Sequence, residues 1–276
     1  HAHYLTPYGY FILPAKCTTI ISLWGSDIRI KYSQSSGLFR RFLNRVMNKA
    51  DILMIPGDYM LDYLDFSRKN IIETIWGIDA EHIGIKNDQE KNLWNFHNDE
   101  YIITSIRVNR DIFQIERIID AVYRICESGY KVKLNLIEGP YTEYNKIIRN
   151  KCRNKQFVNI YNHLSHEQYV SLLRATDIAV SIALEDAGPV SVKESMALGL
   201  PVIYQDIEGI NRTIDSSTGF PLSTRSKDEL IEVINTIIND TGKREMIARN
   251  AREFAISSFS QKTYISRVMG IYERLT

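Results

Sequence analysis

Short apolar runs rich in β-branched residues alternate along this chain with longer stretches in which apolar positions recur every three or four residues. The short runs predict strands, and the longer stretches predict amphipathic helices. In the first part of the chain the predicted strands are Thr18–Trp24, Ile52–Ile55 and Ile71–Ile75, and the predicted helices are Leu38–Asn48 and Tyr59–Arg68. This part is therefore expected to form an α/β unit.

The alternation is more regular in the second half of the chain. The predicted strands there are Tyr101–Arg107, Val132–Ile137, Val158–Tyr161, Ile178–Ile182 and Val202–Tyr204. The predicted helices are Ile112–Glu127, Tyr144–Asn154, Glu167–Arg174 and Val190–Leu198, with two or three more from Asp228 onward. Several of these strands are apolar without alternation, as expected when helices cover both faces of a sheet. The pattern therefore predicts doubly wound α/β domains with parallel sheets.

The polar segment from Ala80 to Glu100 is weakly periodic and predicts a linker between two halves. Residues 1–97 would form a first Rossmann-like domain with this linker, and residues 98–258 a second one. Residues 259–276 would form a helix that crosses back to the first domain. The chain opens at His1 in what reads like the end of a strand, so the first domain is expected to lack its leading strand–helix units.

Composition and charge narrow the range of functions. The chain has 276 residues, of which 44% are hydrophobic, and 34 Lys and Arg nearly balance 33 Asp and Glu. A net charge of +1 does not favour nucleic acid as the partner. The three cysteines lie far apart, so neither a disulfide framework nor a zinc site is expected. The sequence shows neither a bilayer-spanning apolar run nor a signal peptide, which predicts a cytoplasmic protein.

The strand-to-helix loops are where chemistry is expected, because ligands of doubly wound sheets bind outside the carboxyl ends of the strands. The sequence contains no GxG, and therefore neither a dinucleotide fingerprint nor a P-loop. This absence counts against NAD-linked chemistry and against phosphoryl transfer of the P-loop type. The isolated pair of His1 and His3 is a weak metal signal, and no metal site is expected.

The loop after the strand ending at Ile182 combines two acids with a helix N-terminus. Asp186 precedes Gly188 and Pro189, and proline suits the first turn of a helix, where its missing N–H costs nothing. The free backbone amides around Gly188 to Ser191 and the positive end of the helix make an anion site. Glu194, one turn into the helix, can accept hydrogen bonds from the vicinal hydroxyls of a ribose. The loop suits a sugar joined to a pyrophosphate and a nucleoside, and a helix start stabilised by acids is the plainer interpretation.

The run from Asp186 to Ile203 resembles the second-domain signature of family-4 retaining glycosyltransferases, which have the GT-B architecture of two Rossmann-like domains. The family pattern is an acid, seven residues and then Glu-Ala-Met-Ala-x-Gly-x-Pro-Val-Ile. From Glu194 this chain reads Glu-Ser-Met-Ala-Leu-Gly-Leu-Pro-Val-Ile, and its first acid is Asp where Glu is commoner. The resemblance therefore implies a GT-B fold, with the first domain incomplete at its N-terminus.

Three other segments agree with this resemblance and follow in the family's order. Leu23–Asp27 resembles the His-Gly-Ser-Asp loop of the first domain, with Trp24 in place of the His. Trp76–Asp79 resembles the Gly-Val-Asp that precedes the interdomain linker, and Asp177–Ser181 resembles the strand that leads to the donor loop.

The resemblance implies a binding site for a nucleoside diphosphate sugar. Glu194 would hold the ribose, and Asp186 the hydroxyls of the donor hexose. Arg107, at the carboxyl end of its predicted strand, would bind phosphate, since a guanidinium can do so bidentately. A structural ion pair is the alternative for Arg107. Contacts to the sugar and the diphosphate would come from Gly188, Pro189, Val190 and Ser191.

The chain departs from the family pattern in both domains. The family usually has a Lys where this chain has Ile112, so a second phosphate cation is either absent or supplied by Arg110. By the same resemblance, Leu164 would fall in the loop that contacts the base in the family. In the first domain Asp27 is the acid expected in the cleft, with helix capping as the alternative. Asp27 and Asp186 are therefore the candidate catalytic acids.

The implied reaction is transfer of a hexose-type sugar from a UDP- or GDP-linked donor to a hydroxyl of a glycan or lipid-linked acceptor, with retention of configuration. No cofactor and no metal are expected. The alternatives are a catalytically silent nucleotide-sugar-binding subunit and a nucleotide-sugar epimerase of similar architecture. Residues 38–49 form a basic amphipathic stretch suited to peripheral contact with the inner face of a membrane. A solvated face over a packed core explains the same stretch.

Overall fold

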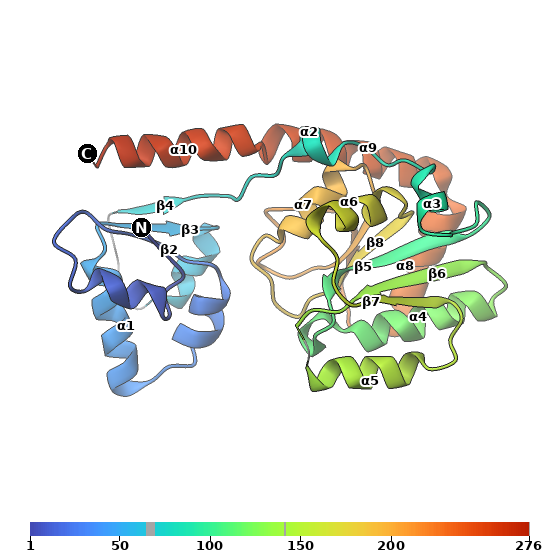
Figure 1. Ribbon diagram of the computed structural model, residues 1–276, viewed down its shortest axis with the longest axis horizontal. Helices are drawn as coiled ribbons and strands as arrows, with labels where there is room; N and C mark the ends of the chain where they lie inside the picture. The colour runs from blue at the N-terminus through green and yellow to red at the C-terminus, as the bar shows by residue number, and fades with distance from the viewer. Residues whose placement is uncertain (65–69, 141, 276) are drawn as a thin grey trace.

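The computed structural model of the chain describes residues 1–64, 70–140 and 142–275. They form two α/β domains, with the first on the left and the second on the right in Figure 1. The first domain contains a four-stranded sheet and the second a six-stranded sheet, and the described strand pairs in both are parallel. The predicted fold class is confirmed.

The first sheet has the strand order β1-β2-β3-β4. Its strands are β1 (Ala2–His3), β2 (Ile20–Ser22), β3 (Ile52–Ile55) and β4 (Ile71–Glu73). Its helices are the 3-10 helix η1 (Tyr8–Ile12), the π-helix η2 (Asp27–Tyr32), α1 (Gly37–Lys49) and the 3-10 helix η3 (Asp58–Tyr63). Of the helix predicted over Tyr59–Arg68, the residues up to Tyr63 are helical, in the 3-10 helix η3. Leu64 takes an extended backbone, and residues 65–68 lie outside the described ranges.

The second sheet has the strand order β10-β9-β8-β5-β6-β7. Its strands are β5 (Tyr101–Val108), β6 (Val132–Ile137), β7 (Val158–Tyr161), β8 (Ile178–Ser181), β9 (Val202–Gln205) and β10 (Phe220–Leu222). Its helices are the 3-10 helix η4 (Asp111–Phe113), α4 (Ile115–Glu127), α5 (Glu143–Cys152), α6 (His166–Arg174), α7 (Val190–Ala197), α8 (Lys227–Asn239) and α9 (Thr241–Ser258).

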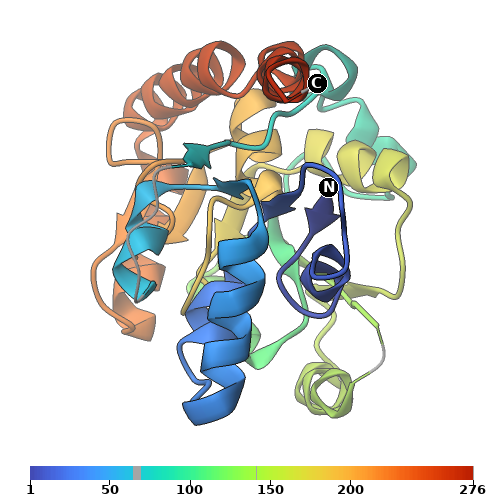
Figure 2. The same ribbon diagram turned by 90° about the vertical axis from the view of Figure 1, so that its left-hand side faces the viewer.

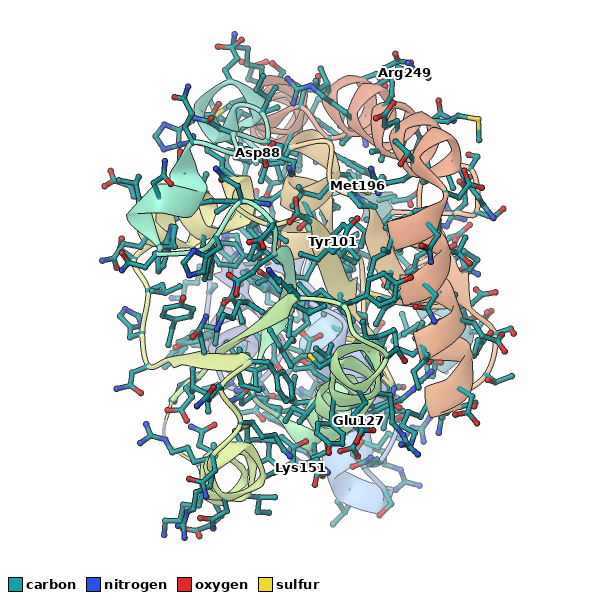
Figure 3. The ribbon with its side chains drawn as sticks, turned by 90° about the vertical axis from the view of Figure 1, so that its right-hand side faces the viewer. Asp88, Tyr101, Glu127, Lys151, Met196 and Arg249 are labelled. Atoms are coloured by element: carbon teal, nitrogen blue, oxygen red, sulfur yellow. The ribbon has the colours of Figure 1, made fainter. Side chains whose placement is uncertain are left out.

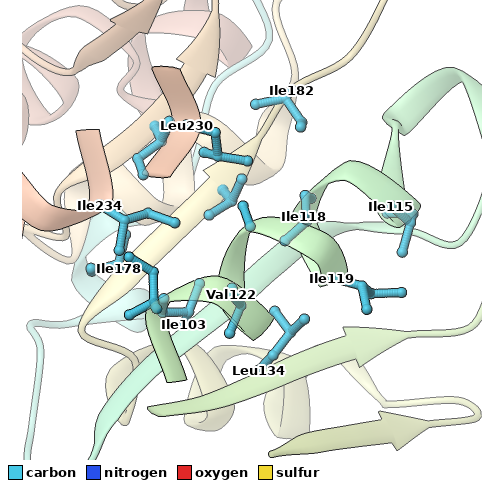
Figure 4. Close-up of a cluster of buried hydrophobic side chains, with 14 of the residues drawn as sticks. Ile103, Ile115, Ile118, Ile119, Val122, Leu134, Ile178, Ile182, Leu230 and Ile234 are labelled. Carbon is cyan, nitrogen blue, oxygen red and sulfur yellow. The ribbon is translucent and has the colours of Figure 1, made fainter. Parts of the chain in front are cut away.

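Helices cover both faces of the second sheet. Residues of α4, α5 and α8 form one hydrophobic cluster with the strands, and residues of α6, α7 and α9 form the cluster on the other face. Figure 4 shows Ile118 and Val122 of α4 and Ile234 of α8 gathered over Ile103 and Ile178 of the central strands. Every residue of β8 and β9 is buried, which explains why these strands read as apolar without alternation.

Two parts of the second domain differ from the prediction. The polar segment expected as a linker contains the short helices α2 (Ala80–Ile83) and α3 (Glu90–Leu93), and Nζ of the buried Lys91 lies 2.8 Å from Oδ2 of Asp177. This segment packs through a buried ion pair, which a hydrophobic pattern does not reveal. Strand β10 was not predicted because it is three residues long and contains Pro221, which only an edge strand accommodates.

The backbone crosses between the domains twice, and the two crossings are hydrogen bonded to each other. The N–H of Ile78 donates to the carbonyl of Phe259 at 2.7 Å, and the N–H of Gln261 donates to the carbonyl of Ile78 at 3.0 Å. The second crossing leads into α10 (Gln261–Glu273), which runs along the top of Figure 1 to the first domain. There its fully buried Ile271 packs against the first sheet.

The carboxyl edge of the second sheet faces the first domain. Tyr101, the first residue of β5, lies with Asp88 at the end of the molecule that Figure 3 turns toward the viewer, away from the first domain. Strand β5 therefore runs toward the first domain, as do the strands parallel to it. Because ligands of such sheets bind at the carboxyl ends of the strands, the site is expected at this junction.

Candidate active site

An ion pair at the carboxyl edge of the second sheet joins three of the predicted site residues. Nη2 of Arg107, near the end of β5, lies 3.2 Å from Oδ2 of Asp186 in the loop after β8. Its Nη1 donates to Oγ of Ser191, in the first turn of α7, at 3.3 Å. The guanidinium carbon lies 4.4 Å from the ring centre of Phe113, a cation–π contact that orients the side chain. Arg107 thus connects β5, the loop after β8 and α7.

The N-terminus of α7 offers backbone donors beside this ion pair. The N–H of Lys193 donates to the carbonyl of Pro189 at 3.4 Å, and the amides of Val190, Ser191 and Val192 precede this bond. Among the residues that the structure describes, no side chain caps this helix end. The helix start therefore keeps the donors and the partial positive charge that an anion requires.

Gly188 and Pro189 shape the loop and do not donate to a ligand. The N–H of Gly188 donates to the carbonyl of Gly209 at 3.0 Å. Its φ of +72° lies in the left-handed region that glycine adopts without strain. Pro189 has no N–H and occupies the N-cap position with φ −63°. The prediction that the Gly188 amide is free is therefore wrong, and the donors begin at Val190.

Glu194 lies three residues after Ser191 and so on the same side of α7. Its side chain is 9% exposed, and its Oε1 lies 2.8 Å from Nε2 of His166, the first residue of α6. Burial raises the pKa of Glu194, and the contact with His166 opposes the rise. The partly buried Tyr169 of α6 lies nearby, and burial together with the charge of Glu194 raises the pKa of its phenol. The carboxylate of Glu194 is thus held on the side of α7 that carries Ser191, the residue that accepts from Arg107.

His166 and Tyr169 are residues of this site that the sequence pattern did not reveal. The sequence feature that could have identified them is the capping box of Ser165 and Gln168, which marks the start of α6 after β7. Because β7 and β8 run in the same direction, the helices that follow them begin at the same edge of the sheet. The capping box therefore places His166 near Glu194, although the two lie 28 residues apart.

Two predicted donor residues are not joined to this group by the contacts of the described residues. Leu164 is half-buried and packs in a hydrophobic cluster with Phe96 and Tyr161. Arg110 is exposed at the start of η4, and no described contact links it to Arg107 or Asp186. The base contact of Leu164 and the second phosphate cation of Arg110 stay predictions.

Asp27 has a structural role in the first domain. It is fully buried, its Oδ2 accepts the N–H of Leu5 at 2.9 Å, and its Oδ1 accepts the N–H of Trp24 at 2.9 Å. Burial raises the pKa of Asp27, and these backbone donors oppose the rise. The carboxylate fastens the loop after β2 to the segment after β1 and has no exposed surface. Asp27 thus holds these two segments together, and its catalytic role stays a prediction.

The two domains touch at the loop that carries Asp186. Gly25 has φ +86°, and a Cβ on it would lie 2.4 Å from Cβ of Ala187. Arg212, after β9, pairs with Asp58 and, at 3.2 Å, with Glu73 of the first domain. The space between the domains at this loop is about 10 Å³. The cleft is therefore closed over the loop.

A cavity of about 810 Å³ lies at the opposite edge of the second sheet, where β5 and β8 begin. Its lining includes Lys86 and Lys91, and Nζ of each is within 3.0 Å of the Asp177 carboxylate. The two ammonium groups pair with the carboxylate, and ligands of parallel sheets do not usually bind at the amino ends of the strands. We therefore place the site at the carboxyl edge.

The family described as glycosyl transferases group 1 matches residues 86–254, more than half of the chain. The chain belongs to this family. The matched residues run from the segment before β5 into α9 and include Arg107, Asp186 and Glu194. Family membership indicates glycosyl transfer as the type of reaction.

Two curated relatives support this assignment. The chain is 26% identical to the uncharacterized glycosyltransferase MJ1178 of Methanocaldococcus jannaschii, over the whole of this chain and 75% of that protein. It is 28% identical to the capsular polysaccharide biosynthesis glycosyltransferase CapM of Staphylococcus aureus, over 71% of this chain and 52% of CapM. The match thus covers about half the length of CapM.

Solved structures share the fold at low sequence identity. Sucrose-phosphate synthase from Thermosynechococcus elongatus matches with a TM-score of 0.85 and 16% identity, over 99% of this chain and 72% of that one. Anabaena HepE in complex with UDP-glucose matches with a TM-score of 0.81 and 17% identity, over 94% of this chain and 72% of that one. The fold is that of the GT-B glycosyltransferases.

Within the described ranges, no three His, Cys, Asp or Glu residues are grouped so as to hold a metal ion. No helix in the described part of the chain has the length and apolar character needed to cross a bilayer.

The close approach of Gly25 to Ala187 predicts a steric test of the domain junction. The substitution Gly25→Ala places a methyl group against Ala187 and a side chain at positive φ, so we expect a loss of about 2–4 kcal/mol in the free energy of unfolding. Chemical denaturation measures this loss. The matched control is Gly129→Ala, which has φ +93° but nothing within 4 Å of its Cβ and isolates the backbone strain.

The compensating substitution Ala187→Gly should recover the steric part of the loss in the Gly25→Ala background and leave the strain that Gly129→Ala reports. If Gly25→Ala costs no more than Gly129→Ala, the two domains are not in contact at this loop.

Proposed function

We propose that the chain binds a nucleoside diphosphate sugar at the carboxyl edge of its second sheet and transfers the sugar to an acceptor hydroxyl with retention of configuration, as family-4 glycosyltransferases do. One observation carries the proposal: the guanidinium of Arg107, the uncapped start of α7 and the carboxylate of Glu194 lie together. Cations and amides suit a diphosphate, and a carboxylate suits the hydroxyls of a ribose. Anabaena HepE, solved with UDP-glucose and with UDP, supports a nucleotide donor.

Asp186 occupies the place of an anion on Arg107. A diphosphate carries more negative charge than a carboxylate and can accept from a guanidinium bidentately. It would therefore replace Asp186 on Arg107 and also accept from the amides of Val190 and Ser191. The released carboxylate of Asp186 would then accept from hydroxyls of the donor hexose.

In the proposed reaction, the bond between the anomeric carbon and the leaving diphosphate oxygen breaks, and a bond to the acceptor oxygen forms on the same face of the sugar. The acceptor proton leaves with the diphosphate. Arg107 and the first amides of α7 would stabilise the charge that develops on the diphosphate. UDP or GDP is the proposed nucleotide, and the proposal includes no cofactor.

We further propose a lipid-linked acceptor, reached at an anionic membrane surface. The only acid among residues 1–50 is the buried Asp27. Leu38 and Phe39, in the first turn of α1, are 81% and 48% exposed, and Phe11 of the neighbouring η1 is 75% exposed. Figure 2 shows α1 projecting from the first domain. The basic residues of this segment are Lys16, Arg29, Lys31, Arg40, Arg41, Arg45 and Lys49.

A nucleotide-sugar-binding subunit without turnover is the second candidate function. The burial of Asp27 favours it, because the first domain then lacks the acid that was predicted in the cleft. Consumption of a donor sugar in the presence of acceptor separates the two candidates. Turnover, with the same anomeric configuration in donor and product, supports the transferase.

The donor site predicts stabilisation by one nucleoside diphosphate out of UDP, GDP, ADP and TDP. At a concentration 100 times its dissociation constant, the matching nucleotide should raise the free energy of unfolding by about 2.7 kcal/mol. A thermal-shift series measures this. The substitution Glu194→Gln should abolish the shift, whereas Glu90→Gln, at a partly buried carboxylate paired with Arg174, should retain it.

Glu194→Gln should not destabilise the chain at neutral pH. Because burial raises the pKa of Glu194, its ionised form costs stability above that pKa, and the glutamine variant lacks this cost. Its advantage should disappear as the pH falls below the ordinary pKa of glutamate. If none of the four nucleotides shifts the unsubstituted chain, the donor proposal is wrong.

The basic face predicts binding to vesicles of phosphatidylcholine that contain phosphatidylglycerol, and none to phosphatidylcholine alone. The double substitution Arg41→Gln and Arg45→Gln should weaken the partition coefficient about 30-fold, at about 1 kcal/mol for each basic residue. Lys262→Gln on the exposed side of α10 is the matched control. Co-sedimentation measures binding, and equal binding to both vesicle types would contradict an electrostatic membrane contact.

A further inference from the structure

Lys193 is a buried cation that the proposed donor chemistry does not use. Its side chain is 1% exposed, in the first turn of α7. A cation is unfavourable at this end of a helix, because the helix dipole is positive there, and burial of an ammonium group adds a desolvation cost. Burial lowers the pKa of Lys193 to about 8. A residue that breaks two local rules at once marks a site where function constrains the sequence.

The ammonium group of Lys193 touches both crossings between the domains. Its Nζ donates to the carbonyl of Trp76, in the first crossing, at 3.0 Å. It also lies 4.9 Å from the ring centre of Phe259, in the second crossing. These crossings are hydrogen bonded to each other through Ile78. Lys193 therefore lies at the hinge about which the two domains would move.

The same ammonium group faces the loop that carries Asp186. The charge of Asp186 acts on Lys193 and favours its protonated form, against the effect of burial. A Cβ on Gly188 would lie 3.9 Å from Nζ of Lys193. Asp186 thus has two cations beside it: Arg107, which would bind the donor, and Lys193, which is bonded to the hinge.

We propose that Lys193 is a positioning residue that couples donor binding to the angle between the two domains. This inference rests on the proposed donor site. When the diphosphate binds Arg107, Asp186 loses that partner and pairs with Lys193 instead. The loop that carries Asp186 shifts in this exchange, and the ammonium group of Lys193 transmits the shift to the carbonyl of Trp76. The ring of Trp76 is well placed to report it, with its centre 4.7 Å from that of Trp24 and 5.2 Å from that of Tyr264.

Tryptophan emission tests the coupling directly. The chain has three tryptophans, and Trp94→Phe removes the one that lies in the second domain, so that the signal comes from Trp24 and Trp76 at the junction. In this background, UDP and GDP are titrated while emission and calorimetric heat are recorded. We expect one of them to bind and to change the emission.

The substitution Lys193→Met should separate binding from the response. The dissociation constant should stay within about threefold, because Arg107 and Glu194 are intact, while the emission change is lost. The melting temperature should change little, because removing the desolvation cost of a buried ammonium group offsets the loss of its hydrogen bond to the carbonyl of Trp76. Lys91→Met is the matched control: it removes another buried lysine, at the far edge of the same sheet, and should keep the emission change.

A second variant covers the case in which Lys193→Met does not fold. Lys193→Gln keeps an N–H donor for the carbonyl of Trp76 but has no charge for Asp186, and it should lose the emission change as well. An emission change that survives in either folded variant overturns the inference. A dissociation constant raised more than about tenfold also overturns it, because Lys193 would then bind the donor itself. An unsubstituted chain that binds neither nucleotide contradicts the proposed function, and the inference falls with it.

Discussion

The carboxyl edge of the second sheet depends on one ion pair, between Arg107 at the end of β5 and Asp186 after β8. Both side chains are largely buried, so the attraction is screened less than on the surface. The pair fixes the loop that leads into α7, and Ser191 of α7 accepts from the same guanidinium. It also keeps an anion on the cation that a diphosphate would need, so Asp186 holds the place on Arg107 that the proposed phosphate would take.

The domain junction follows from this arrangement. The described strands of the second sheet are parallel and run toward the first domain, so the edge at which such sheets usually bind ligands is also the interdomain face. The loop after Asp186 touches Gly25, and the first turn of α7 reaches both chain crossings through Lys193. A ligand that moves this loop therefore acts on the first domain directly, through these contacts. Such coupling is useful to a transferase, which must bring donor and acceptor together before reaction.

Periodicity and spacing predicted much of the molecule, and the misses have physical causes. The strands of the second sheet were predicted from apolar runs, and the helix that carries Glu194 from the Gly and Pro residues at its ends. Both features are local in the sequence, so a single chain shows them. The structural role of Asp27 was not visible in the sequence because its carboxylate accepts from the N–H of Leu5, 22 residues away. The Gly188 amide was expected to be free because its acceptor, Gly209, comes from another loop. Long-range partners decide the role of a polar residue.

The structure of the chain with its nucleoside diphosphate bound tests the central claim most directly. The account predicts that phosphate oxygens lie within hydrogen-bond distance of Arg107 and of the amides of Val190 and Ser191, that ribose hydroxyls donate to Glu194, and that Asp186 has left Arg107. A nucleotide bound elsewhere, for example in the cavity beside Lys86 at the amino ends of the strands, would contradict it. A phosphate that leaves the pair of Arg107 and Asp186 intact would contradict it equally.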